Sequence, residues 1–227
     1  MQRPGLILFD CDGVLVNTEP VVQQVLADWI TQHGWPMTAE ECARTVKGSH
    51  IAQIQTRLEQ RTGGSYPDFI DGYRRAMFQA FESGVDEIPG AGVVLQTLRD
   101  AGMPFCIASN GPHVKMAVSM RSAGLLEHFG GTLDPSLVFS ADDVGEPKPS
   151  PKLFLHAANT MGFDPGECLV IDDSHQGVEA ALKAGMSIIA YEDMTPASKL
   201  HEAGAEIVMS RLEELLTLLG LESSNPA

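Results

Sequence analysis

Two aspartates follow a short apolar run close to the amino terminus, and this junction constrains the fold more than any other stretch of the chain. The run, residues 6–9, predicts a buried strand, and after it come Asp10, Cys11, Asp12 and Gly13. In an open α/β sheet, ligands bind outside the carboxyl ends of the strands. We therefore predict that both aspartates lie at a ligand site. For such a pair taken alone, a turn that carries two solvated acids is the alternative.

Strand-like and helix-like segments alternate along the chain from residue 88 onward. Because strands that alternate with helices form parallel sheets with right-handed crossovers, this order predicts an α/β, Rossmann-like core. The predicted strands cover residues 105–109, 137–140, 168–173 and 187–190, with a weaker one at 205–208. The predicted helices cover residues 93–101, 114–123, 151–161, 178–184 and 211–219.

The chain between the first strand and this alternating part has helical character. Residues 17–20 form a helix-start signature with a proline in the first turn. Apolar residues at helical spacing, separated by breaks that contain glycine or proline, predict three to five helices and no convincing strand across residues 17–86. We therefore predict a parallel-sheet core, residues 1–16 and 87–227, with a helical cap domain, residues 17–86, inserted after its first strand.

The formal net charge of −15 limits the partners of the protein. A chain this acidic repels nucleic-acid backbones and anionic membrane surfaces, so we predict neither as a partner. A small anionic substrate would need a local positive group. The cysteines are scattered without a Cys-x-x-Cys pair, and the sequence shows neither a signal segment nor an apolar run long enough to span a membrane. These features predict a cytoplasmic location.

Polar groups suited to phosphate chemistry follow the other predicted strands. Ser109 and Asn110 follow one strand, and Asp172 and Asp173 end another. Lys148 lies between two prolines. Taken singly, the serine fits a helix cap, the lysine a solvated charge and the acid pair another cap. Together they fit phosphate-ester cleavage, in which carboxylates hold Mg²⁺ and supply a nucleophile while a lysine stabilises charge on the phosphoryl group.

The haloacid dehalogenase-like hydrolases carry four motifs, which this sequence resembles at Asp10-Cys11-Asp12-Gly13-Val14, Ser109-Asn110, Lys148 and Asp172-Asp173. The inserted helical block resembles the small α-helical cap of the β-phosphoglucomutase and phosphatase branch of that family. The resemblance covers essentially the whole chain. A narrower similarity, to the bacterial 6-phosphogluconate phosphatases, is carried by Ser109-Asn110-Gly111-Pro112-x-x-Lys115-Met116-x-x-Ser119-Met120.

The resemblance implies a division of catalytic roles. It makes Asp10 the nucleophile, which forms an aspartyl-phosphate. It makes Asp12 the general acid for the leaving oxygen and then the base for water. It also implies that Ser109 and Lys148 bind the phosphoryl group that is transferred.

The resemblance further implies a cofactor and a set of substrate contacts. Mg²⁺ would be held by Asp10, the backbone carbonyl of Asp12, and Asp173. Asp172 would ligate the metal or orient a metal-bound water. The expected substrate-binding residues, from the core loop and from the cap, are Asn110, Gly111, Lys47, Gly48, His50 and Arg74.

These features predict a Mg²⁺-dependent phosphatase that hydrolyses a small sugar or sugar-acid phosphate, with 6-phosphogluconate as a candidate. A β-phosphoglucomutase-like sugar-phosphate mutase is the alternative within the family. The positions that match the mutases' cap histidine and cap-loop arginine fall at Val22 and Ile51, which disfavours a mutase. A non-catalytic regulatory protein that binds a phosphorylated metabolite is the alternative from another class. The presence of both Asp10 and Asp12 argues against it, because binding alone needs no leaving-group acid.

Overall fold

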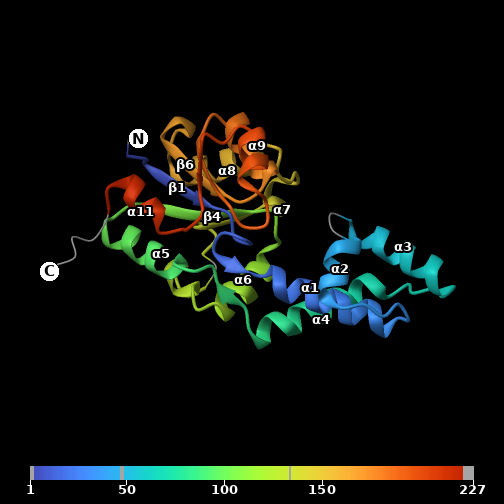
Figure 1. Ribbon diagram of the computed structural model, residues 1–227. Coiled ribbons are helices and arrows are strands. Elements are labelled where there is room, and N and C mark those ends of the chain that lie inside the picture. The colour runs from blue at the N-terminus through green and yellow to red at the C-terminus, as the bar shows by residue number, and fades with distance from the viewer. Residues whose placement is uncertain (1–2, 47–48, 133, 222–227) are drawn as a thin grey trace. The chain divides into compact units, whose positions relative to one another are not determined.

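The computed structural model describes residues 3–46, 49–132 and 134–221 (Figure 1). The chain divides into two compact units, one formed by Met1–Asn17 with Asp86–Ala227 and the other by Thr18–Val85. The division falls one residue from each boundary predicted from the sequence. Within the described ranges, no helix combines the length and the apolar character needed to cross a membrane.

The larger unit is built on a parallel sheet. In the described part of the chain, six strands pair in the order β5, β4, β1, β6, β7, β8. They are β1 (Leu6–Phe9), β4 (Phe105–Ser109), β5 (Val138–Ser140), β6 (Cys168–Asp172), β7 (Ser187–Tyr191) and β8 (Ile207–Met209). β1 pairs with β4 on one side and with β6 on the other, so it is a central strand. The predicted Rossmann-like core is confirmed, and Asp10 follows a central strand at the carboxyl edge of the sheet.

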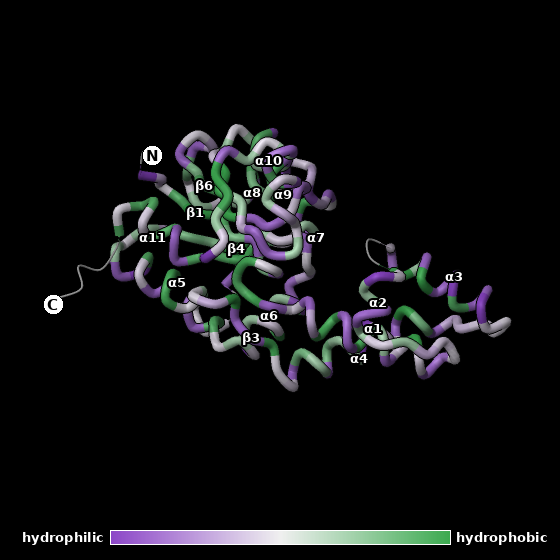
Figure 2. Tube along the Cα trace, viewed as in Figure 1, coloured by the Kyte–Doolittle hydropathy of each residue, from purple (hydrophilic) through white to green (hydrophobic). Residues whose placement is uncertain are grey.

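Helices pack on both faces of this sheet, with α5 and α11 on one side and α8 and α9 on the other (Figure 1). Because side chains alternate along a strand, Leu6 and Leu8 join a buried cluster with α8 and α9, whereas Phe9 packs edge-on against Phe105. Figure 2 shows hydrophobic residues concentrated along β4 and β6. The helical segments are α5 (Ala91–Asp100), α6 (His113–Ser122), η1 (Leu126–Phe129), α7 (Ala141–Val144), α8 (Lys152–Met161), η2 (Pro165–Glu167), α9 (His175–Lys183), α10 (Ala197–Glu202) and α11 (Glu214–Leu219).

A short antiparallel ribbon lies where the chain leaves the larger unit and returns to it. β2 (Val16–Asn17) pairs with β3 (Asp86–Glu87). The sequence predicts no strand over residues 17–86, and the structure corrects this at both ends of that range. Two residues per strand are too few to show an alternating pattern, so the pairing depends on contacts between segments distant in sequence.

The smaller unit is helical and has a hydrophobic core of its own. Its described helices are α1 (Glu19–Gln32), α2 (Ala39–Val46), α3 (Ile51–Thr62) and α4 (Phe69–Ser83). Buried residues from all of these helices, among them Ile30, Cys42, Leu58 and Phe69, form one cluster. Gly72 lets α4 approach the Trp29 ring, because a Cβ at this position would lie 2.3 Å from a ring carbon.

Candidate active site

A cavity of about 360 Å³ opens at the carboxyl ends of β1, β4 and β6. All of its lining residues belong to the larger unit. They are Asp10, Asp12, Ser109, Asn110, Gly111, Pro112, Lys115, Lys148, Asp173 and Ser174. The structure therefore brings together the predicted catalytic residues from all four sequence motifs.

The loop after β1 holds its two acids through the backbone. The amide of Asp10 donates to the carbonyl of Ile171 in β6 at 2.9 Å. Gly13 has a φ of 78°, a conformation that favours glycine. Its amide donates a hydrogen bond of 2.9 Å to the carbonyl of Val16, which closes the turn. A Cβ at Gly13 would also lie 2.4 Å from a carboxylate oxygen of Asp173. The glycine is thus required both by the turn and by the acid packed against it.

Lys148 is buried and bridges two acids. Its Nζ donates to Asp10 Oδ1 at 2.7 Å and to Asp172 Oδ2 at 2.8 Å, and its side chain is 3% exposed. Burial disfavours the ammonium, but Asp10 and Asp172 outweigh this effect and raise the pKa of Lys148. Burial, with a contribution from Asp172, raises the pKa of Asp10 to about 6 despite the lysine. A solvated lysine, the simpler explanation of this residue, is excluded.

Both carboxylate oxygens of Asp172 accept hydrogen bonds. Oδ2 accepts from Lys148, and Oδ1 accepts from the backbone amide of Ser174 at 2.9 Å and from its hydroxyl at 2.7 Å. Gly177 in α9 makes room for this group, since a Cβ there would overlap the carboxylate. Ser174, and not an acid, is the residue that caps α9. Helix capping therefore does not explain the Asp172–Asp173 pair.

The loop after β4 is tied to its neighbours by side chains. Asn110 Oδ1 accepts the backbone N–H of Lys148 at 2.8 Å, and the Ser140 hydroxyl donates to the carbonyl of Gly111 at 2.9 Å. The Ser109 hydroxyl, almost fully buried, accepts the amide of Gly111 at 3.2 Å. Pro112 occupies the cap position of α6 and makes no side-chain cap, so Ser109 is not a helix cap. Asn110 thus positions the segment that carries the buried lysine.

Lys115, in the first turn of α6, is a site residue to which the sequence motifs assigned no role, although it belongs to the stretch that is similar to the 6-phosphogluconate phosphatases. Its Nζ donates to Asp12 Oδ2 at 2.7 Å. Burial alone would lower the pKa of Lys115, but Asp12 outweighs it and raises that pKa. The signal available in the sequence was its place on the helix that directly follows the Ser109 strand end, which directs early side chains toward the carboxyl edge of the sheet.

The balance of charge in the site fits a divalent cation. Its acids and bases are Asp10, Asp12, Asp172 and Asp173, and Lys115 and Lys148. With all of them ionised, four negative and two positive charges leave two negative charges in excess. Burial, followed by the charges of Asp172 and Asp10, raises the pKa of Asp173 to about 9.

The donors on the cavity wall are of the oxygen type that magnesium accepts. Among the described residues, no group of three or more His, Cys, Asp or Glu side chains is arranged to form a complete metal-binding cage, that is, to hold a metal ion by itself. Mg²⁺ does not need such a cage, because it is commonly held by one or two carboxylates together with waters and substrate phosphate. Asp10 and Asp173, both on the cavity wall, provide those carboxylates.

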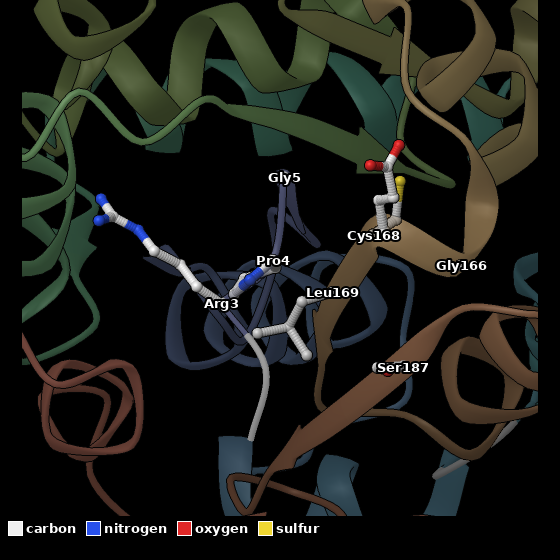
Figure 3. Close-up of a pocket in the computed structure, with 8 residues that line it drawn as sticks. Arg3, Pro4, Gly5, Gly166, Cys168, Leu169 and Ser187 are labelled. Carbon is white, nitrogen blue, oxygen red and sulfur yellow. The ribbon is translucent and has the colours of Figure 1, made fainter.

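Another cavity, of about 290 Å³, lies at the opposite edge of the sheet, around Gly5 and the first residues of β6 and β7. Figure 3 shows Arg3 extending away from Leu169 and Ser187. Its guanidinium donates to the carbonyl of Ala101 at 3.3 Å. The ionisable groups gather at the carboxyl edge instead, and we assign the site there.

The predicted substrate residues of the cap lie in the smaller unit. His50 immediately precedes α3, and its backbone amide donates to Gln53 Oε1 at 3.2 Å. Arg74 is exposed on α4 and lies 3.7 Å from Asp71. Lys47 and Gly48 lie outside the described residues.

Fold and site together define a class of protein: a Rossmann-like core that carries carboxylates and a buried lysine around a cavity at the carboxyl edge of its sheet. The haloacid dehalogenase-like hydrolase family matches residues 4–185, and the chain belongs to this family. The resemblance seen in the four sequence motifs is confirmed.

Individual relatives narrow the class. The chain is 31% identical to 6-phosphogluconate phosphatase of Escherichia coli K12 over 84% of each chain. It is 31% identical to hexitol phosphatase A of the same organism, over 92% of this chain and 91% of that one. A HAD family hydrolase from Deinococcus radiodurans, solved with bound phosphate and sodium, matches with a TM-score of 0.81 and 32% identity over the full length of both chains. The protein is a phosphoric monoester hydrolase, as the sequence predicts.

Proposed function

We propose that the protein is a cytoplasmic, Mg²⁺-dependent phosphatase that hydrolyses a small sugar or sugar-acid phosphate through an aspartyl-phosphate on Asp10. The observation that carries the proposal is the joint placement of Asp10, Asp12 and the buried Lys148 on one cavity wall. The names of the relatives, a 6-phosphogluconate phosphatase and a hexitol phosphatase, support this substrate class. The burial of the four cysteines as free thiols supports the location.

The first step is transfer of the phosphoryl group to the protein. A carboxylate oxygen of Asp10 forms a bond to phosphorus while the bond from phosphorus to the sugar oxygen breaks. Lys148 and the Ser109 hydroxyl hold the phosphoryl oxygens as their charge is redistributed. Asp12 gives its proton to the leaving sugar oxygen.

The second step returns Asp10 to its starting state. A water molecule loses a proton to Asp12 as its oxygen bonds to phosphorus. The bond between phosphorus and Asp10 then breaks, which releases inorganic phosphate and leaves Asp12 protonated for the next cycle. One acid therefore serves both steps, because it gives a proton in the first and recovers one in the second.

Magnesium would be held by Asp10, the backbone carbonyl of Asp12, and Asp173. Bound there, it would reduce the repulsion between the anionic substrate and the carboxylate that attacks it. Asp172 orients rather than ligates in this proposal, because both of its oxygens already accept hydrogen bonds from Lys148 and Ser174.

We assign substrate selection to residues that line the cavity and to residues of the cap. Gly111 and Asn110 line the cavity in the larger unit. The cap contributes the remaining proposed contacts, which are Lys47, Gly48, His50 and Arg74.

A phosphate-release assay tests the proposal. Purified protein with Mg²⁺ is incubated with 6-phosphogluconate, hexitol phosphates and hexose phosphates, and inorganic phosphate and organic products are followed by NMR. We expect one phosphate for each dephosphorylated product, no turnover in EDTA and none with Asp10→Asn. Accumulation of an isomeric sugar phosphate would instead identify a mutase. Tight substrate binding without turnover would identify a regulatory protein.

A further inference from the structure

Lys115 contacts the proposed acid and base of the reaction from a distant part of the chain. Its Nζ lies 2.7 Å from Asp12 Oδ2, although the two residues are 103 positions apart in sequence. The Lys115 side chain is 20% exposed and that of Asp12 is 26% exposed, so both are largely shielded while still reaching the cavity.

Helix stability does not explain a lysine at this position. Lys115 lies in the first turn of α6, where the unpaired backbone amides favour acidic side chains and disfavour cationic ones. The contact with Asp12 is therefore the feature that accounts for a lysine here.

The surrounding geometry directs Lys115 to Asp12. A Cβ at Gly111 would lie 3.7 Å from Lys115 Cδ and 3.6 Å from Asp12 Oδ2, so the lysine stem passes this glycine on its way to the carboxylate. Lys148 approaches from a different loop and pairs with Asp10. Each of the two proposed catalytic acids thus has a lysine of its own.

We propose that Lys115 is a positioning residue that holds the carboxyl group of Asp12 where it meets the leaving oxygen in the first step and the attacking water in the second. This inference rests on the proposed function. Attack by Asp10 on phosphorus does not depend on Lys115. Loss of Lys115 therefore impairs the two proton transfers and spares phosphorylation by a substrate whose leaving group needs no proton.

The test uses Lys115→Met, which keeps the length of the stem and removes the charge, and Lys115→Gln as a second variant. Lys115→Arg is the conservative rescue. Lys199→Met is the matched control, because Lys199 makes an equally short ion pair, 2.7 Å to Glu202, with 62% of its side chain exposed and outside the cavity lining. Thermal unfolding and circular dichroism check that each variant folds.

Stopped-flow measurement with p-nitrophenyl phosphate and Mg²⁺ separates the two steps. We expect Lys115→Met and Lys115→Gln to release one nitrophenolate per enzyme in a burst within about threefold of the wild-type rate, followed by turnover slowed about 10–100-fold. On the best sugar phosphate, kcat should fall by a similar factor while KM changes by less than about threefold. Lys115→Arg should recover most of the turnover, and Lys199→Met should match the wild type.

A double variant shows whether Lys115 acts through Asp12. If it does, Asp12→Asn combined with Lys115→Met is no slower than Asp12→Asn alone. Additive losses, wild-type turnover in Lys115→Met, equal slowing of the burst and of turnover, or a rise in KM of about tenfold at constant kcat would each overturn the inference. A wild-type protein that releases no phosphate from any substrate would overturn the proposed function instead.

Discussion

At the scale of single residues, the site is a balance between buried acids and two lysines. Lys148 pairs with Asp10 and with Asp172, and all three side chains are largely withdrawn from water. A buried ion pair is costly to break because the group left behind is charged and unsolvated. The ion pairs of Lys148 therefore both align Asp10, the proposed nucleophile, and make the local fold depend on the Lys148 ammonium group.

Lys148→Ala should lose activity and stability together. We expect kcat to fall by about 10²–10³, as for other groups that stabilise transition-state charge. The free energy of unfolding at pH 7 should fall by about 3–5 kcal/mol, because two buried acids lose their partner. Adding Asp172→Asn should restore part of the stability and none of the activity, which urea unfolding and phosphate release would measure. Equal stability of Lys148→Ala and the wild type would contradict the buried bridge.

Asp173 should make the metal-free protein less stable as the pH rises. Its pKa rises from 3.8 to about 9 in the folded state, so between these values the folded protein binds more protons than the unfolded chain. The free energy of unfolding therefore falls as the pH increases through that window. The pKa of Asp10 is raised to about 6, so Asp10 also lowers the free energy of unfolding as the pH rises to about 6.

Thermal unfolding in EDTA at pH 5 and pH 8 would measure this effect. Asp173→Asn should unfold several degrees higher than the wild type at pH 8, since 1 kcal/mol corresponds to about 2–4 °C for a chain of this size. The difference should be smaller at pH 5. Added Mg²⁺ should stabilise the wild type, more so at pH 8, and have little effect on the variant. Identical pH slopes for the two proteins would contradict the proposed cause.

At the scale of elements, segments with a clear apolar pattern could be predicted from the sequence, whereas β2, β3, α7 and α10 could not. Every residue of β1 and β6 is buried, and all of them except Asp172 at the end of β6 are apolar, so their pattern is unambiguous. β2 and β3 have two residues each, and α7 and α10 have too few turns for a hydrophobic period. The same distinction holds in the site. The acids at strand ends were visible as motifs, whereas Lys115 acquires its place only when α6 packs beside the loop after β1.

The packing of α9 on β6 depends on a glycine. Gly177→Ala would place a Cβ on the Asp172 carboxylate, and an overpacked contact of this kind costs about 1–3 kcal/mol. We expect lower stability, measured by urea unfolding, and a reduced kcat because Asp172 also holds Lys148. Gly166→Ala is the control, since a Cβ there meets no atom within 4 Å. Equal effects of the two substitutions would show that the close contact is not what matters.

At the scale of the whole molecule, the site and the helical unit are separable in sequence. Every residue that lines the cavity comes from the larger unit, and the chain leaves and re-enters that unit through the paired β2 and β3. Asn17 and Asp86 are cross-strand partners, so a two-residue turn can join them.

Replacing residues 18–85 by Asn-Gly should therefore leave a folded larger unit. We expect this variant to keep its circular dichroism signature and measurable hydrolysis of an aryl phosphate, because the proposed catalytic residues remain. Its kcat/KM values for different sugar phosphates should lie within about tenfold of one another, because the proposed cap contacts are gone. The intact protein assayed beside it is the reference, and retained selectivity would place specificity in the larger unit.

The position of β1 in the sheet also sets an order of events during synthesis. β1 is made first, but its partners β4 and β6 end at Ser109 and Asp172. At about 5–20 residues per second, β1 waits for several seconds during synthesis before either of its edges can pair with a neighbouring strand. The helical segment at 18–85 emerges complete in that interval and, with a core of its own, can fold while the sheet is still unfinished. The insertion thus gives the growing chain a segment that can fold directly after its first apolar strand in sequence.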